Sequence, residues 1–91
     1  MNICMAGIDF HRANLAQREP ISFVAGQVEN LLPRIQETEG VLGCVLIATC
    51  NRTELYLHTA HKKVDPLLLL TKAANVPLAA YREIAAVREG E

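Results

Sequence analysis

Hydrophobic and polar positions divide this 91-residue chain into alternating strand-like and helix-like segments. Residues 2–8 are mostly apolar and predict a first strand. From Val24 to Ile35 the apolar residues recur at helical spacing, which predicts a helix. Ser22 is placed to cap the start of this helix, and Gly40 is placed to end it.

Two strands are predicted in the middle of the chain. The run Val41–Ala48 is apolar throughout and too short for a typical helix, so it predicts a strand that is covered on both faces. Residues 54–58 alternate instead, with Leu55 and Leu57 on one face and polar or aromatic residues on the other. The short polar connection between the two runs predicts a tight antiparallel hairpin.

The last third of the chain predicts one more helix and one more strand. Asp65-Pro66 opens a helix, because proline is favoured at the first helical position, and Asn75 and Pro77 end it. Residues 81–87 predict a weak, alanine-rich strand. The resulting order of strand, helix, strand, strand, helix, strand predicts an α+β fold with two helices on one face of an antiparallel sheet. The apolar strand 41–48 then needs a cover on its second face, so we predict a missing domain or a partner subunit, a homo-oligomer included.

Length and composition indicate one ordinary globular domain over residues 1–91. The net charge of −1 argues against strong sequence-independent binding of nucleic acid. No apolar run reaches the roughly 20 residues that span a bilayer, so we expect no membrane, and the N-terminus lacks the pattern of a signal peptide. The three cysteines form an odd number without C-x-x-C spacing, which disfavours disulfides or a zinc site and favours a cytoplasmic location.

Candidate chemistry lies in the polar stretch Thr49-Cys50-Asn51-Arg52-Thr53-Glu54. Unpaired polar groups are costly to bury, so a polar cluster at the end of a buried strand is expected to point outward and to act on other molecules. A thiolate such as that of Cys50 is a strong nucleophile, and the fork of Arg52 matches a carboxylate. Glu54 lies on the outward face, where it can pair with Arg52. For Cys4 and Cys44, inside strands, we expect a structural role.

This stretch, followed by Leu55-Tyr56, resembles the signature of glutamyl-tRNA reductase. Two other blocks support the resemblance, which covers the whole chain but only the first part of a family member. They are Gly7-Ile8-Asp9 with Ala13 and Arg18-Glu19, and, more faintly, Arg88-Glu89-Gly90-Glu91. The resemblance implies a ferredoxin-like β-α-β-β-α-β unit, in agreement with the predicted order of elements.

The resemblance also implies an oxidoreductase of tetrapyrrole (porphyrin) biosynthesis with glutamyl-tRNA as substrate. Cys50 would be the catalytic nucleophile that forms a thioester, which NADPH, held by a separate domain, reduces to glutamate-1-semialdehyde. Arg52 would engage the substrate carboxylate, and Thr49 and Asn51 would line the pocket, although Thr49 fits a capping role at the strand end equally well. A family histidine that is a candidate general acid or base is matched here by Arg88.

The chain lacks the NADPH-binding and dimerisation domains that the resemblance implies. It contains no G-x-G-x-x-G, so we assign no cofactor site and no metal site to it, and we do not expect it to complete the reduction alone. The alternative is a non-catalytic regulatory or interaction module derived from this fold, which would bind a tetrapyrrole-pathway partner, haem or tRNA. Arg88 and the short length favour this alternative.

Overall fold

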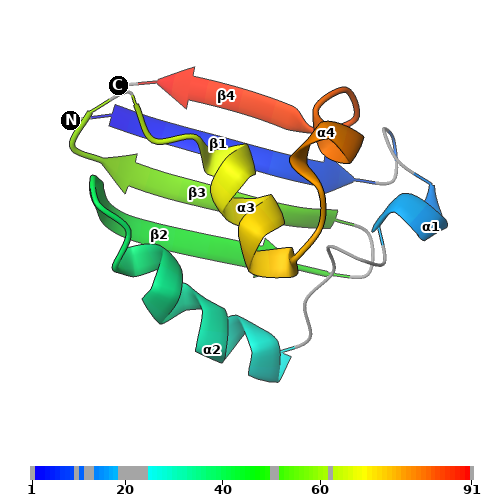
Figure 1. The fold of residues 1–91 in the computed structure, drawn as a ribbon, viewed down its shortest axis with the longest axis horizontal. Coiled ribbons are helices and arrows are strands. Elements are labelled where there is room, and N and C mark those ends of the chain that lie inside the picture. The colour runs from blue at the N-terminus through cyan, green and yellow to red at the C-terminus, as the bar shows by residue number, and fades with distance from the viewer. Residues whose placement is uncertain are drawn as a thin grey trace.

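Strands from both ends of the chain meet in one sheet (Figure 1). The computed structural model describes residues 2–9, 11, 14–18, 25–49, 52–61 and 63–90. Its elements are β1 (Asn2–Asp9), α1 (Leu15–Arg18), α2 (Ala25–Gln36), β2 (Val41–Ala48), β3 (Arg52–Thr59), α3 (Pro66–Ala74), α4 (Leu78–Tyr81) and β4 (Ala86–Gly90). No helix among these residues has the length and apolarity that crossing a membrane requires.

The sheet has four strands in the order β2-β3-β1-β4, and each neighbouring pair is antiparallel. The predicted α+β fold with an antiparallel sheet is therefore confirmed. One core cluster joins Ile35 of α2, Leu67 of α3 and Tyr81 of α4 to side chains of β1 and β3. These three helices consequently lie over the same face of the sheet (Figure 1).

Strand β3 shows how the alternating sequence selects the buried face. Leu55 and Leu57 are fully buried against the helices, and Thr53 and Thr59 lie on the same buried side. In β1, Ala6 is paired with Leu55, so the small side chain of Ala6 lies next to the large side chain of Leu55 in the core. The predicted alternation of β3 is confirmed, and it leaves the outward side chains of the strand on the other face.

That other face of the sheet carries exposed apolar side chains. Val45 of β2 is 58% exposed and Ile3 of β1 is 53% exposed. Each lies across from an outward residue of β3, since Val45 is paired with Tyr56 and Ile3 with His58. The helices pack on one face only, so the described residues leave side chains on the second face of β2 exposed. The cover predicted for this face, a missing domain or a partner subunit, stays a prediction.

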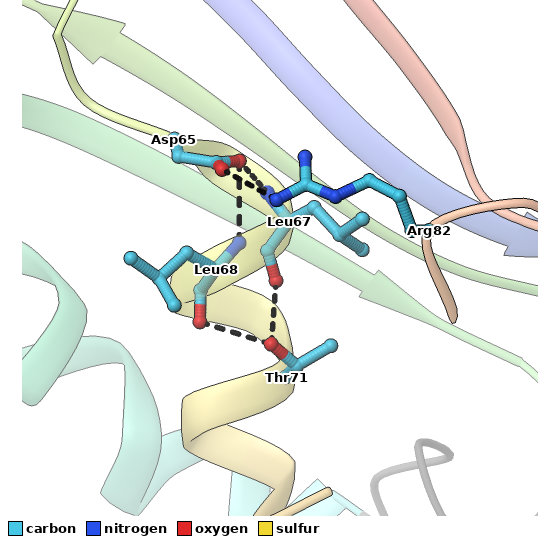
Figure 2. Close-up of polar contacts among 5 residues, drawn as sticks. All are labelled: Asp65, Leu67, Leu68, Thr71 and Arg82. Atoms are coloured by element: carbon cyan, nitrogen blue, oxygen red, sulfur yellow. Dashed lines mark hydrogen bonds and ion pairs between the residues drawn. The ribbon is translucent and has the colours of Figure 1, made fainter. Parts of the chain in front are cut away.

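Helix α3 begins and ends where the sequence predicts. The Asp65 carboxylate accepts hydrogen bonds from the backbone N–H groups of Leu67 and Leu68, at 3.0 and 3.3 Å, and so caps the helix (Figure 2). Asn75 adopts a left-handed conformation at the C-terminal end, with φ of 57°. A second contact, 3.7 Å from Asp65 Oδ2 to Arg82 Nη2, ties the start of α3 to the segment after α4.

One predicted helix boundary is wrong. Helix α2 ends at Gln36, and Gly40 instead lies in the turn before β2 with φ of +89°. A Cβ at Gly40 would also meet the side chains of His61 and Val64 at 2.8 and 2.9 Å, so this glycine serves the turn rather than the helix end. The predicted cap Ser22 lies outside the described residues.

The predicted last strand at residues 81–87 is also displaced. Residue Tyr81 ends α4, and β4 begins only at Ala86. Tyr81 is held by a hydrogen bond of 2.9 Å from its hydroxyl to the backbone oxygen of Gln17, far away in sequence. Alanine-rich sequence has weak strand propensity, so local sequence alone does not extend β4 back to Tyr81.

Candidate functional site

The turn between β2 and β3 brings Thr49 and Arg52 together. The backbone N–H of Thr49 donates to the carbonyl oxygen of Arg52 at 2.8 Å, and the N–H of Arg52 donates to Thr49 Oγ1 at 3.2 Å. The pairing of β2 with β3 extends up to this turn, so the predicted tight hairpin is confirmed. Cys50 and Asn51, which join the two residues in sequence, lie outside the described residues. The Thr49 side chain is exposed and also serves the turn itself.

Arg52 points to the outward side of the sheet, where it forms an ion pair with Glu54. The two residues are two positions apart on β3 and therefore share a face. Nε of Arg52 lies 3.6 Å from Oε1 of Glu54, and the two side chains are 54% and 18% exposed. This confirms the predicted pair and leaves more than half of the Arg52 side chain accessible.

Strand β1 supplies the residues beside this pair. Gly7 is paired with Glu54, and Asp9 is paired with Arg52. Two motif blocks that are distant in sequence therefore lie side by side. Strand β1 ends at Asp9, so the loop that follows it begins at this end of the sheet. Within this loop, the backbone N–H of His11 donates a hydrogen bond of 2.9 Å to Oδ1 of Asp9.

Asp9 was absent from the site residues inferred from the sequence. Its signal was its position at the end of the first strand, inside one of the motif blocks. Only the register of β1 against β3 shows that this carboxylate belongs beside Arg52. Directly opposite, oppositely charged residues on paired strands stabilise a sheet modestly, typically by about 0.2–1 kcal/mol.

Gly7 provides the room in which Glu54 lies. A Cβ at this position would stand 3.0 Å from Cγ of Glu54 and 3.2 Å from Cε of Met5. Such distances are tighter than ordinary van der Waals contacts, so a side chain here would displace its neighbours. Gly7 of the block Gly7-Ile8-Asp9 thus packs against Glu54 of the polar stretch Thr49–Glu54.

The two cysteines that the structure describes are at least partly buried. Cys4 faces the core from β1, and burial raises the pKa of its thiol, with Glu89 and Asp65 adding to the shift. Burial likewise raises the pKa of the Cys44 thiol, whose Sγ lies 3.9 Å from the backbone oxygen of Leu32 in α2. Both groups therefore remain protonated thiols over a wider pH range than an exposed cysteine. These features agree with the structural role expected for them.

Arg88 does not lie at this end of the sheet. It is paired with Met5, which is four positions from Asp9 along β1, or about 13 Å at the usual rise per residue. Arg88 is thus separated from the β2–β3 turn along the direction of the strands. The described residues also contain no group of three or more His, Cys, Asp or Glu side chains that could hold a metal ion.

Comparison with known proteins identifies the family of this chain. A family model described as the N-terminal domain of glutamyl-tRNA(Glu) reductase matches residues 6–91. Glutamyl-tRNA reductase from Alkaliphilus oremlandii is 36% identical over 100% of this chain, and that from Acetivibrio thermocellus is 36% identical over 99% of it. The chain spans only 28% of the length of each of these relatives.

A solved structure leads to the same group. Glutamyl-tRNA reductase from Methanopyrus kandleri superposes with a TM-score of 0.65 at 25% identity, covering 97% of this chain and 19% of that one. The fold and the hairpin motif thus define a small α+β domain of the kind found in glutamyl-tRNA reductases. This chain belongs to the family of glutamyl-tRNA reductase N-terminal domains.

Proposed function

We propose that residues 1–91 form a single domain that bears the reactive thiol of a glutamyl-tRNA reductase and acts in tetrapyrrole biosynthesis. Cys50 is the nucleophile that receives the glutamyl group from glutamyl-tRNA. The main support is the register of β1 against β3, which joins two motif blocks at the end of the sheet where the Cys50 connection lies. Family membership supports the same assignment.

The proposed step is an acyl transfer that balances without an oxidant or reductant. The thiolate of Cys50 attacks the carbonyl carbon of the ester that joins glutamate to the terminal ribose of the tRNA. A carbon–sulfur bond forms, the carbon–oxygen bond of the ester breaks, and the released ribose hydroxyl takes up a proton. The products are a glutamyl thioester on Cys50 and free tRNA, so a difficult reduction is divided into two easier steps.

Arg52 is the proposed binding group for the side-chain carboxylate of the substrate glutamate. Arg52 directly follows the Cys50-Asn51 connection in sequence, its side chain is more than half exposed, and a guanidinium can form two parallel hydrogen bonds to a carboxylate. Thr49, which stands beside Arg52 across the turn, lines the same pocket. Asn51 is assigned to the pocket from the motif alone.

We assign NADPH binding to a further domain or a partner subunit, not to these residues. Every neighbouring strand pair in the described sheet is antiparallel, whereas a dinucleotide-binding unit is built from parallel βαβ strands. The described residues therefore do not fit this cofactor, and we derive no step through it. Reduction of the thioester to glutamate-1-semialdehyde is assigned to a further domain or a partner subunit.

The fold itself supports a ferredoxin-like β-α-β-β-α-β assignment, which we also propose. In this assignment, α2 is the connection between β1 and β2, and α3 is the connection between β3 and β4. The sheet order β2-β3-β1-β4 has each connected pair separated by one antiparallel strand, as this topology requires. The short helices α1 and α4 are additions to it.

The test is the intact mass of the protein after brief incubation with glutamyl-tRNA. We expect a mass increase of one glutamyl group in the parent and in Cys44→Ala, and none in Cys50→Ala. A folded parent protein with a free thiol that gains no adduct would overturn the proposal.

The exposed apolar side chains on the sheet face away from the described helices favour a second candidate function. Ile3 and Val45 are both more than half exposed on that face, as expected for a surface that contacts a partner protein. In this case the domain is a non-catalytic interaction module. Saturable binding of a partner by a domain that forms no glutamyl adduct would select this function.

A further inference from the structure

Helices α2 and α3 lie next to each other over the sheet and leave a groove between them (Figure 1). Helix α2 packs mainly on the edge strand β2, whereas α3 packs on β1 and β3. Residues of both helices line a hollow of about 310 Å³. A second hollow of about 560 Å³ continues toward the start of α3, since Thr38 and Leu69 line both hollows. The two hollows together form one surface feature, the helix groove.

The floor of the helix groove is apolar. Leu69 and Ala73 of α3 are half-buried and pack against the core cluster, and Leu31 of α2 is half-buried as well. Leu68, at the other end of the groove, is 43% exposed. Apolar grooves of this kind accept the apolar face of an amphipathic helix, whose anchoring side chains recur at helical spacing.

Two cations flank the hollow between α2 and α3. Arg34 lies in the last turn of α2 and Lys72 in the last turn of α3, and both residues are exposed. Within the described part of the chain, neither side chain forms an ion pair and no carboxylate lines this hollow. The second hollow is mixed in charge, because Glu39 and Lys63 both line it. The part of the groove between the two helices is therefore complementary to acidic side chains.

A cation in the last turn of a helix also has a local effect, since it offsets the negative end of the helix dipole. This effect acts on each helix separately and requires no hollow between them. It does not account for the position of Arg34 and Lys72 on the two sides of one apolar groove. The local effect changes helix stability alone, whereas a binding role also changes the affinity for an acidic partner.

We propose that the helix groove binds an amphipathic helix of a partner protein, with acidic side chains beside its apolar row. The apolar row lies against Leu31 and Leu69, and the carboxylates pair with Arg34 and Lys72. The groove lies on the face of the sheet that carries the helices, so it is distinct from the exposed apolar face with Ile3 and Val45. None of its lining residues belongs to the β2–β3 turn, so binding here does not depend on the thiol chemistry.

The experiment uses a synthetic peptide of about 14 residues, which is about four turns of helix. It carries leucine at positions i, i+4 and i+7, glutamate beside that row, and a staple on the opposite face. The staple is needed because helices of this length are marginal in water. A companion peptide carries lysine in place of every glutamate. Fluorescence anisotropy gives the dissociation constants, and amide NMR shifts identify the residues that the peptide contacts.

The variants Arg34→Glu and Lys72→Glu reverse the charge of the groove, and Leu68→Ala removes part of its apolar lining. The matched controls lie elsewhere on the surface. Arg88→Glu on β4 is the control for charge. Leu42→Ala on β2 is the control for apolar area, since Leu42 is 49% exposed and Leu68 is 43% exposed. Urea unfolding shows that each variant is folded and measures the local effect on stability.

We expect the glutamate peptide to bind more tightly than the lysine peptide, with NMR shifts in α2 and α3. Arg34→Glu and Lys72→Glu should each weaken its binding by about two- to tenfold, the range for replacing an exposed ion pair by a like-charge pair. Lys72→Glu should bind the lysine peptide more tightly than the parent does. Leu68→Ala should also weaken binding, and both control variants should match the parent.

Several results would overturn the inference. Equal affinity for the two peptides, or an equal loss in Arg88→Glu and Arg34→Glu, would contradict charge complementarity. Absence of saturation at about 1 mM peptide, or shifts confined to the opposite sheet face, would exclude the groove as the binding site. Shifts in α2 and α3 that depend on protein concentration without peptide would assign the groove to a second copy. Tighter binding of a short RNA at the same residues would assign it to nucleic acid.

Discussion

Asp9 on β1 and Arg52 on β3 are cross-strand partners at the end of the sheet where the β2–β3 turn lies. The ion pair of Arg52 with Glu54 on the same strand lies at this end of the sheet as well. An exposed pair of this kind contributes roughly 0–1 kcal/mol to stability.

Cys50 should react with iodoacetamide at pH 7 faster than Cys4 and Cys44 do. Burial raises the pKa of both of these thiols and restricts reagent access to them, whereas the proposal requires an accessible Cys50 thiol beside a positive charge. Peptide mapping by mass spectrometry after short exposure measures the three rates. In urea the rates should converge, and similar rates in the folded protein would contradict an activated Cys50.

The stability of the domain should decrease as the pH rises above about 8.5, the ordinary pKa of a thiol. The pKa of the Cys4 thiol is raised in the folded state. At pH values between the unfolded-state pKa and the folded-state pKa, the folded chain therefore binds more protons than the unfolded chain. Stability then falls with increasing pH, and this contribution is fully present only below the unfolded-state pKa. Urea unfolding at several pH values should show a steeper loss in the parent than in Cys4→Ala. Equal slopes would contradict the assignment.

Asp65→Ala should destabilise the domain by about 1 kcal/mol, the usual cost of removing an N-terminal helix cap. The substitution removes the acceptor for the N–H groups of Leu67 and Leu68 and also the ion pair with Arg82 (Figure 2). Asp65→Asn is the matched control, since asparagine also caps helices while it loses the charge. Urea unfolding should place Asp65→Asn near the parent, and a loss as large as that of Asp65→Ala would show that the Arg82 pair dominates.

The local parts of the fold could be predicted from the sequence. Alternation assigned Leu55 and Leu57 to the core, and Asp65-Pro66 marked the start of α3, because each signal lies within a few residues of its effect. The pair of Arg52 with Glu54 was predicted for the same reason, as the two residues share one face of one strand.

The parts that depend on distant residues could not be predicted. Gly40 serves a turn that packs on His61 and Val64, and Tyr81 is fixed by a bond to Gln17, so local propensity misplaced both boundaries. Asp9 joined the site only through strand register, which no short motif encodes.

In the proposed function, Arg52 recognises the substrate carboxylate while the neighbouring Cys50 takes the acyl group. The most direct measurement is the rate of Cys50 acylation by glutamyl-tRNA relative to the glutaminyl form, in the parent and in Arg52→Lys. Lysine keeps the positive charge but cannot form the paired hydrogen bonds of a guanidinium. We predict a clear preference for the glutamyl donor in the parent and a reduced preference in Arg52→Lys. Equal preference in the two proteins would contradict the account.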